Sequence, residues 1–135
     1  MQAAASVNQV PRTISWPGRA LSALVVLFMV FDGVLHVLKP APVVEAFAQL
    51  GYPIRVSIGL GLVELVCTAL YAIPRTAVLG AVLLTAYLGG AIATQLRIEA
   101  GLFPLVFPAM LGALLWGGLA LRDPRVRALI SARDA

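Results

Sequence analysis

Three side chains that can exchange protons or bind a ligand lie inside long apolar stretches of this sequence. Asp32 and Glu64 are acids within hydrophobic runs, and His36 follows Asp32 by four residues. Residues four apart share one face of a helix, so Asp32 and His36 are expected one turn apart. An acid at the centre of a bilayer costs about 2.5–3.5 kcal/mol on insertion scales, so it needs a partner or a proton. The three residues therefore indicate a polar site for a ligand or a proton.

Two facing helices can bring the two acids together. Glu64 lies near the middle of its run and Asp32 in the half nearer Lys39, a difference in depth of roughly 5 Å. Two neighbouring carboxyls disfavour double ionisation, so the deeper Glu64 is expected to be protonated near neutral pH. Polar residues of the third run reach similar depths. The candidate pocket consists of Asp32, His36, Glu64, Tyr87, Thr94 and Gln95.

Simple packing is the alternative interpretation of these side chains. Polar residues in membrane bundles hydrogen-bond across helices, for about 0.6 kcal/mol on average. Asp32 and His36 are open to both interpretations, whereas the mid-span position of Glu64 favours ligand or proton handling. No ligand-spacing motif is present, so we expect no metal. The sequence identifies no catalytic residue and does not decide whether the protein is an enzyme.

The composition is that of an integral membrane protein. Hydrophobic residues make up 61 % of the 135, charged residues 12 %, and the mean hydropathy is +0.96. A soluble domain averages about 45–50 % apolar and about 25 % charged residues. The basic residues lie at the ends of apolar runs, which argues against a nucleic-acid partner and for the lipid bilayer. The single cysteine, Cys67, excludes an intramolecular disulfide and a multi-cysteine metal site.

Four apolar runs of about 18–20 residues are each long enough to cross a hydrocarbon layer about 30 Å thick. Their connections are short, and Pro74 ends one helix and begins a turn. The sequence therefore predicts an all-α integral membrane four-helix bundle, connected up-down-up-down. The predicted spans are Ala20–Leu38, Val56–Ile73, Ala77–Gln95 and Leu102–Leu121.

The connection Lys39–Arg55 is longer than the others and has an amphipathic pattern. It predicts a short interfacial helix near Val43–Leu50, with Phe47 and Leu50 turned toward the bundle or lipid. We expect a cytoplasmic arm over residues 1–18, a membrane domain over 19–123 and a basic tail over 124–135.

The distribution of basic residues predicts the orientation. Seven lie on the side of the two termini and the Pro74 turn, and three on the other. The positive-inside rule then places both termini in the cytoplasm. The seven are Arg12, Arg19, Arg75, Arg122, Arg125, Arg127 and Arg133, and the three are Lys39, Arg55 and Arg97.

Three segments carry a resemblance to a known family. They are FDGVLHVLKPAPVVEAFAQLGYP (31–53), LYAIPRTAVLGAVLLTAYLGGAIATQLR (70–97) and FPAMLGALLWGGLALRDPRVRALI (107–130). The chain after Arg19 resembles the DoxX-like family of small bacterial membrane proteins, most specifically in IPRTAVLGA and YLGGA. The resemblance implies a four-helix membrane bundle. Relatives include subunits of quinone-linked thiosulfate oxidation and accessory partners of redox enzymes.

Three functions follow as hypotheses. The first is an accessory or subunit protein of quinone-linked redox systems, with a redox enzyme or a second copy as its partner. The second is an enzyme or binder of a lipophilic small molecule in the Asp32–His36–Glu64 pocket. The third is a conduit for protons or small solutes. The cofactor is undetermined, and a quinone is the candidate that the resemblance suggests.

Overall fold

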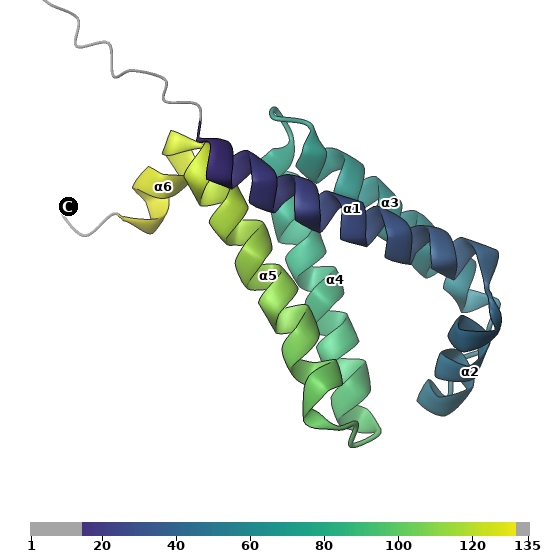
Figure 1. Ribbon diagram of the computed structural model, residues 1–135. Helices are drawn as coiled ribbons and strands as arrows, with labels where there is room; N and C mark the ends of the chain where they lie inside the picture. The colour runs from purple at the N-terminus through teal and green to yellow at the C-terminus, as the bar shows by residue number, and fades with distance from the viewer. Residues whose placement is uncertain (1–14, 132–135) are drawn as a thin grey trace, which may run out of the picture.

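The computed structural model describes residues 15–131, and these form six helices and no strand (Figure 1). Most of the expected arm and the last four residues of the tail lie outside the described residues. The all-α prediction is confirmed. The helices are α1 (Trp16–Leu38), α2 (Ala41–Leu50), α3 (Val56–Ala72), α4 (Ala77–Arg97), α5 (Leu102–Arg122) and α6 (Pro124–Ile130).

The four predicted spans correspond to α1, α3, α4 and α5. Helices α1, α4 and α5 are long and apolar enough to cross a membrane, and the shorter apolar α3 has 17 residues. At 1.5 Å per residue α3 is about 25 Å long, close to the thickness of a hydrocarbon layer. The chain is a multi-pass membrane protein by the hydropathy of its helices.

Local sequence signals set the helix ends. The hydroxyl of Ser15 accepts a hydrogen bond from the Gly18 amide at 3.3 Å and caps the start of α1. Lys39 ends α1 with a left-handed φ of 53°, and Gly51 ends α2 with a φ of 71°. Ile73 ends α3 in an extended conformation because the next residue is Pro74.

The predicted short helix between the first two spans is present as α2. Its Phe47 is buried and lies edge-on to the His36 ring, with 5.7 Å between the ring centroids. Leu50 is half-buried, and its carbonyl accepts a hydrogen bond from the Arg97 guanidinium at the end of α4. Arg97 also lies over the Tyr52 ring, 5.5 Å from its centroid. The end of α2 is therefore tied to the end of α4.

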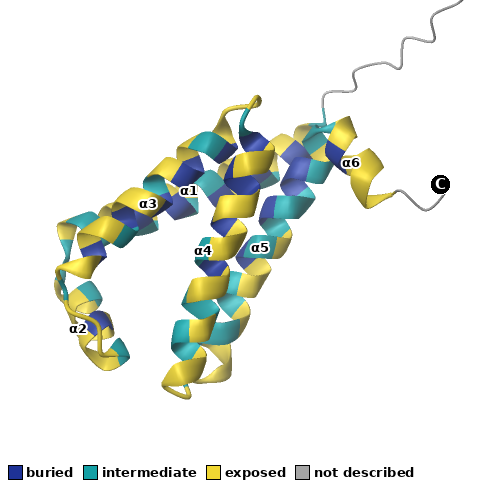
Figure 2. Cartoon of the chain, turned by 180° about the vertical axis from the view of Figure 1, so that it is seen from behind, coloured by how far each residue is buried: buried dark blue, intermediate teal, exposed yellow. Residues whose placement is uncertain are grey.

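Helices α1 and α3 lie side by side, as do α4 and α5 (Figures 1 and 2). The two pairs meet where α1 begins and α5 ends, which we call the terminal end. They diverge toward α2 and the α4–α5 turn, which we call the loop end. Buried residues concentrate where the pairs meet, and exposed residues dominate the loop end (Figure 2).

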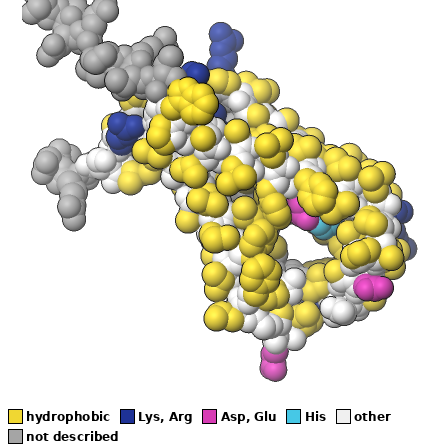
Figure 3. Space-filling model, viewed as in Figure 1, with side chains coloured by type: hydrophobic (Ala, Val, Ile, Leu, Met, Phe, Trp, Pro, Cys, Tyr) yellow, Lys and Arg dark blue, Asp and Glu magenta, His cyan; other side chains and the backbone are white. Residues whose placement is uncertain are grey.

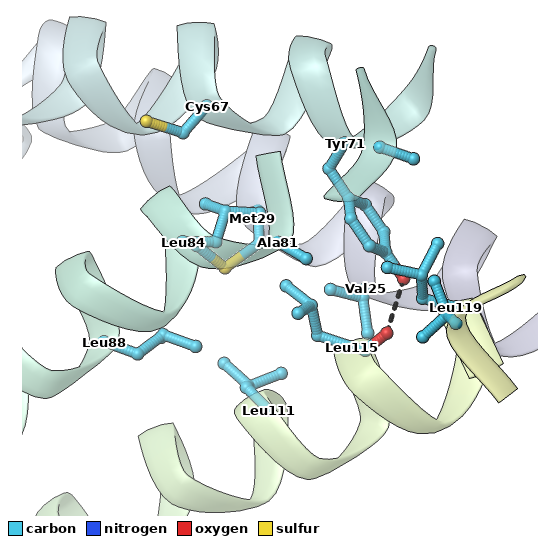
Figure 4. Close-up of a cluster of buried hydrophobic side chains, with 12 residues drawn as sticks. Val25, Met29, Cys67, Tyr71, Ala81, Leu84, Leu88, Leu111, Leu115 and Leu119 are labelled. Atoms are coloured by element: carbon cyan, nitrogen blue, oxygen red, sulfur yellow. Dashed lines mark hydrogen bonds between the residues drawn. The ribbon is translucent and has the colours of Figure 1, made fainter. Parts of the chain in front are cut away.

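Tyr71 of α3 joins three helices at the terminal end. Its hydroxyl donates to the Leu115 carbonyl of α5 at 2.7 Å and lies 3.0 Å from the Ser22 hydroxyl of α1. The ring is fully buried in the apolar core drawn in Figure 4. A Cβ added at Gly118 would lie 2.7 Å from the Ser22 hydroxyl oxygen, so α5 approaches α1 closely because this residue is glycine. The terminal end is thus packed and cross-linked.

Candidate functional site

The structure brings Asp32, His36 and Glu64 together between α1 and α3. The His36 Nδ1 atom lies 3.5 Å from Asp32 Oδ2 and 3.8 Å from Glu64 Oε2. The Glu64 side chain is 0 % exposed, that of His36 18 % and that of Asp32 38 %. The three side chains therefore form a gradient from a fully buried acid to one that reaches the surface.

Tyr87 of α4 completes the cluster. Its hydroxyl donates to Glu64 Oε2 at 2.9 Å, whereas Glu64 Oε1 has no hydrogen-bond partner among the described residues. A buried carboxyl oxygen without a partner is unfavourable, because neither protein nor hydrocarbon solvates it. Glu64 Oε1 can accept a hydrogen bond from a donor that the described residues do not supply. We refer to Asp32, His36, Glu64 and Tyr87 as the polar cluster.

The orientation of His36 follows from its partner in its own helix. Nδ1 lies 2.9 Å from the Asp32 carbonyl oxygen, which can only accept a hydrogen bond, so Nδ1 carries the proton. The Nε2 atom of a neutral ring is then an acceptor. The Ser57 hydroxyl donates to the His36 carbonyl at 2.7 Å and fixes this turn of α1 to α3. His36 is therefore held by both helices.

Glycine allows the close approach of α1 and α3 at this site. A Cβ added at Gly61 would lie 2.6 Å from the Gly33 carbonyl oxygen and 2.8 Å from His36 Cβ. These separations are shorter than van der Waals contact, so a larger residue would push the two helices apart. Gly61 thereby sets the distance between His36 and the face of α3 that carries Glu64.

The polar cluster lies beside a hollow in the molecular surface. Figure 3 shows an opening between the diverging helix pairs, with mostly hydrophobic side chains around it. Histidine and acidic side chains lie at the edge of this opening in the same view. The arrangement combines apolar walls with polar groups at one end, as in pockets for small molecules.

Two residues of the predicted pocket are not joined to the polar cluster. Thr94 donates its hydroxyl proton to the Gly90 carbonyl of its own helix at 2.8 Å. Within residues 15–131, neither Thr94 nor Gln95 has a side-chain hydrogen bond to Asp32, His36 or Glu64. The pair lies on α4 beyond Tyr87, toward the loop end, where α4 diverges from α3.

Three neighbours of His36 were not among the predicted site residues. These are Phe47, Ser57 and Gly61. Ser57, Gly61 and Glu64 recur at helical spacing along one face of α3, and this was the available sequence signal. The sequence predicts that Phe47 turns toward the bundle or lipid, and the structure places its ring against that of His36.

The cluster also has the donor atoms that a metal ion would need. Asp32, His36 and Glu64 each offer one ligand atom, and these atoms lie within 4.8 Å of one another. Zinc bonds of about 2.0–2.2 Å would require the donors to move closer together. The expectation of a metal-free site stays a prediction.

The comparisons with known proteins bear on the family. A model of the DoxX-like family matches residues 20–118. Comparison with curated proteins and with solved structures gave no match. The matched range includes all of α2, α3 and α4, most of α1 and α5, and the whole polar cluster. The sequence segments that suggested the family lie largely within this range, and the chain belongs to the DoxX-like family.

Proposed function

We propose that this protein binds a lipophilic small molecule from the bilayer, with the polar head group of that molecule at the polar cluster. The observation that carries the proposal is the unpartnered Oε1 of Glu64, which is fully buried beside His36. An unsatisfied carboxyl oxygen in hydrocarbon costs several kcal/mol. A hydroxyl group of a ligand would satisfy it.

A quinone, in its reduced quinol form, is the ligand class that we favour. Each quinol hydroxyl can donate a hydrogen bond, and Glu64 Oε1 and a neutral His36 Nε2 are both acceptors. The apolar walls of the hollow suit a ring and an isoprenoid tail. The DoxX-like family, whose relatives include subunits of quinone-linked thiosulfate oxidation, supports the same ligand class.

We also propose that the protein is an accessory protein of such redox systems in a bacterial inner membrane, with both termini in the cytoplasm. The relatives that the resemblance suggests support the accessory role. The excess of basic residues on the side of the two termini, seven against three, supports the orientation.

Co-purification of quinone tests the proposal. The full chain is purified in mild detergent from a quinone-producing bacterial membrane, and bound quinones are extracted and measured by liquid chromatography and mass spectrometry. We expect quinone to be retained by the wild type. Glu64→Leu removes both carboxyl oxygens, and the loss of one ligand hydrogen bond should lower the retained amount by about fivefold.

Glu45→Leu is the matched control. It makes the same chemical change on the exposed face of α2, so quinone retention should equal that of the wild type. Equal retention by Glu64→Leu and Glu45→Leu, or no quinone in any sample, would contradict the proposal. Proton flux into liposomes that depends on Glu64 would favour a proton conduit instead.

A further inference from the structure

A second recess lies at the terminal end, far along α1 from the polar cluster. Its volume is about 240 Å³, and it lies among α1, the end of α3 and the end of α5. Two arginines and a serine supply its polar groups, and three small apolar residues supply the rest of its wall. The lining residues are Arg19, Ser22, Ala23, Val26, Ala72 and Arg122.

The guanidinium of Arg122 is fixed in place at this recess. Its Nη2 atom donates a hydrogen bond to the Tyr71 carbonyl oxygen at 2.8 Å, and the guanidinium carbon lies 4.8 Å from the centroid of the Tyr71 ring. Its Nε atom is buried without a hydrogen-bond partner among the described residues. A guanidinium has five N–H donors, and a single bond to a carbonyl leaves most of them open. A fixed planar donor of this kind suits an oxyanion.

No acidic side chain of the described residues forms an ion pair with the arginines of the recess. Both charged residues in its lining are arginines, and neither Arg19 nor Arg122 forms an ion pair within residues 15–131. Asp123 follows Arg122 directly, but its carboxylate accepts from the Arg125 amide and caps α6. Two like charges beside one recess at the edge of the hydrocarbon favour a bound anion.

The position of the recess at the ends of the membrane-crossing helices indicates which kind of anion it would bind. Arg19 lies in the first turn of α1 and Arg122 is the last residue of α5, so both are at the ends of membrane-crossing helices. Phosphate groups of lipids lie at this level of a bilayer. Trp16, which is 77 % exposed at the start of α1, is typical of the same interface.

We propose that Arg19 and Arg122 bind a phosphate group, and that its source is the head group of an anionic phospholipid. The guanidinium of Arg122 meets the phosphate oxygens, and Arg19 supplies the second positive charge. Ala23, Val26 and Ala72 line the apolar side of the recess, where the first carbons of the lipid chains would lie. This site is independent of the proposed quinone site.

Lipid retention by the full-length protein tests the site. Delipidated protein in mild detergent is mixed with phosphatidylglycerol or with phosphatidylcholine, and bound lipid is counted by native mass spectrometry. We expect phosphatidylglycerol to be retained in preference to phosphatidylcholine. Removal of one charged donor in Arg19→Gln should lower its retention by about tenfold.

Two further variants make the result interpretable. Arg125→Gln removes an exposed arginine of α6 outside the recess and should retain phosphatidylglycerol as the wild type does. Arg122→Gln should lose the lipid as Arg19→Gln does, but it also loses the bond to Tyr71. Arg19 has no side-chain hydrogen bond within the described residues, so Arg19→Gln is the decisive variant.

The source of the phosphate is distinguished by adding inorganic phosphate alone. Thermal stabilisation by phosphatidylglycerol but not by millimolar phosphate supports the lipid. Stabilisation by inorganic phosphate that is lost in Arg19→Gln would assign the site to the free ion and overturn the lipid source. Equal lipid retention by the wild type, Arg19→Gln and Arg125→Gln would overturn the site itself. Quinone content should be unchanged in Arg19→Gln, so the two proposals fail separately.

Discussion

The Tyr87 hydroxyl of α4 donates a hydrogen bond to Glu64 Oε2 of α3 at 2.9 Å. Glu64 belongs to the pair of α1 and α3, and Tyr87 belongs to the pair of α4 and α5. The bond therefore crosses between the two helix pairs. It couples the position of α4 to the buried acid of the polar cluster.

Tyr87→Phe should destabilise the protein. The variant leaves Glu64 Oε2 without the donated hydrogen bond in a site that water does not solvate, which costs about 1–3 kcal/mol. Thermal unfolding in detergent, followed by circular dichroism, measures the loss. Tyr52→Phe is the control, because Tyr52 is 39 % exposed and its hydroxyl has no hydrogen bond among the described residues. Equal melting temperatures for the two variants would show that the bond contributes nothing.

Glu64 should carry a proton at neutral pH. Its side chain is fully buried, Asp32 lies close by, and no lysine or arginine pairs with it within the described residues. Infrared spectroscopy should show the carbonyl band of a protonated carboxyl, absent in Glu64→Gln and retained in Glu45→Gln. A wild-type spectrum with carboxylate bands alone would show instead that Glu64 is ionised.

Gly61→Ala should weaken the polar cluster. The added methyl group would lie 2.6 Å from the Gly33 carbonyl oxygen and 2.8 Å from His36 Cβ. The overpacking should cost about 1–3 kcal/mol and lower quinone retention with it. Gly59→Ala is the matched control on the same helix, because an added Cβ there has no neighbour within 4 Å. It should leave stability unchanged or raise it by up to about 1 kcal/mol, since alanine is the better helix former. The reverse order of stabilities would refute this packing argument.

The orientation can be tested with reporter fusions. A reporter at Ala135 should indicate the cytoplasm, and one inserted within Ala41–Gln49 should indicate the opposite side, because the basic residues favour the terminal end. Reports from the same side of the membrane would contradict the up-down-up-down arrangement of spans.

The helices were predictable because their signals are local. Apolar runs long enough to cross a bilayer, the turn at Pro74 and the amphipathic pattern of 43–50 are all properties of short segments. The meeting of Asp32 with His36 followed from helical spacing, and Glu64 followed from its depth. These arguments need no knowledge of how the helices cross.

The divergence of the helix pairs was not predictable in this way. Depth in the bilayer placed Thr94 and Gln95 level with His36, but depth does not fix the distance between helices. That distance depends on contacts such as Gly118 with Ser22 and Gly61 with His36, which join residues far apart in the sequence. Helical periodicity gives the face of each helix and leaves its crossing angle open.

The hydrogen bonds of Tyr71 join the two helix pairs at the terminal end. Its hydroxyl and carbonyl groups link α3 to α1 and α5 through Ser22, Leu115 and Arg122, so the helix pairs are held together there. Helix α4 has 21 residues and is about 30 Å long, so a rotation of about 5° at one end moves the other by about 2.6 Å. A small change in the angle between the helix pairs can leave every hydrogen bond of Tyr71 intact and still change the side-chain contacts at the loop end. The separation of the helix pairs at the loop end is therefore sensitive to small changes in their angle at the terminal end.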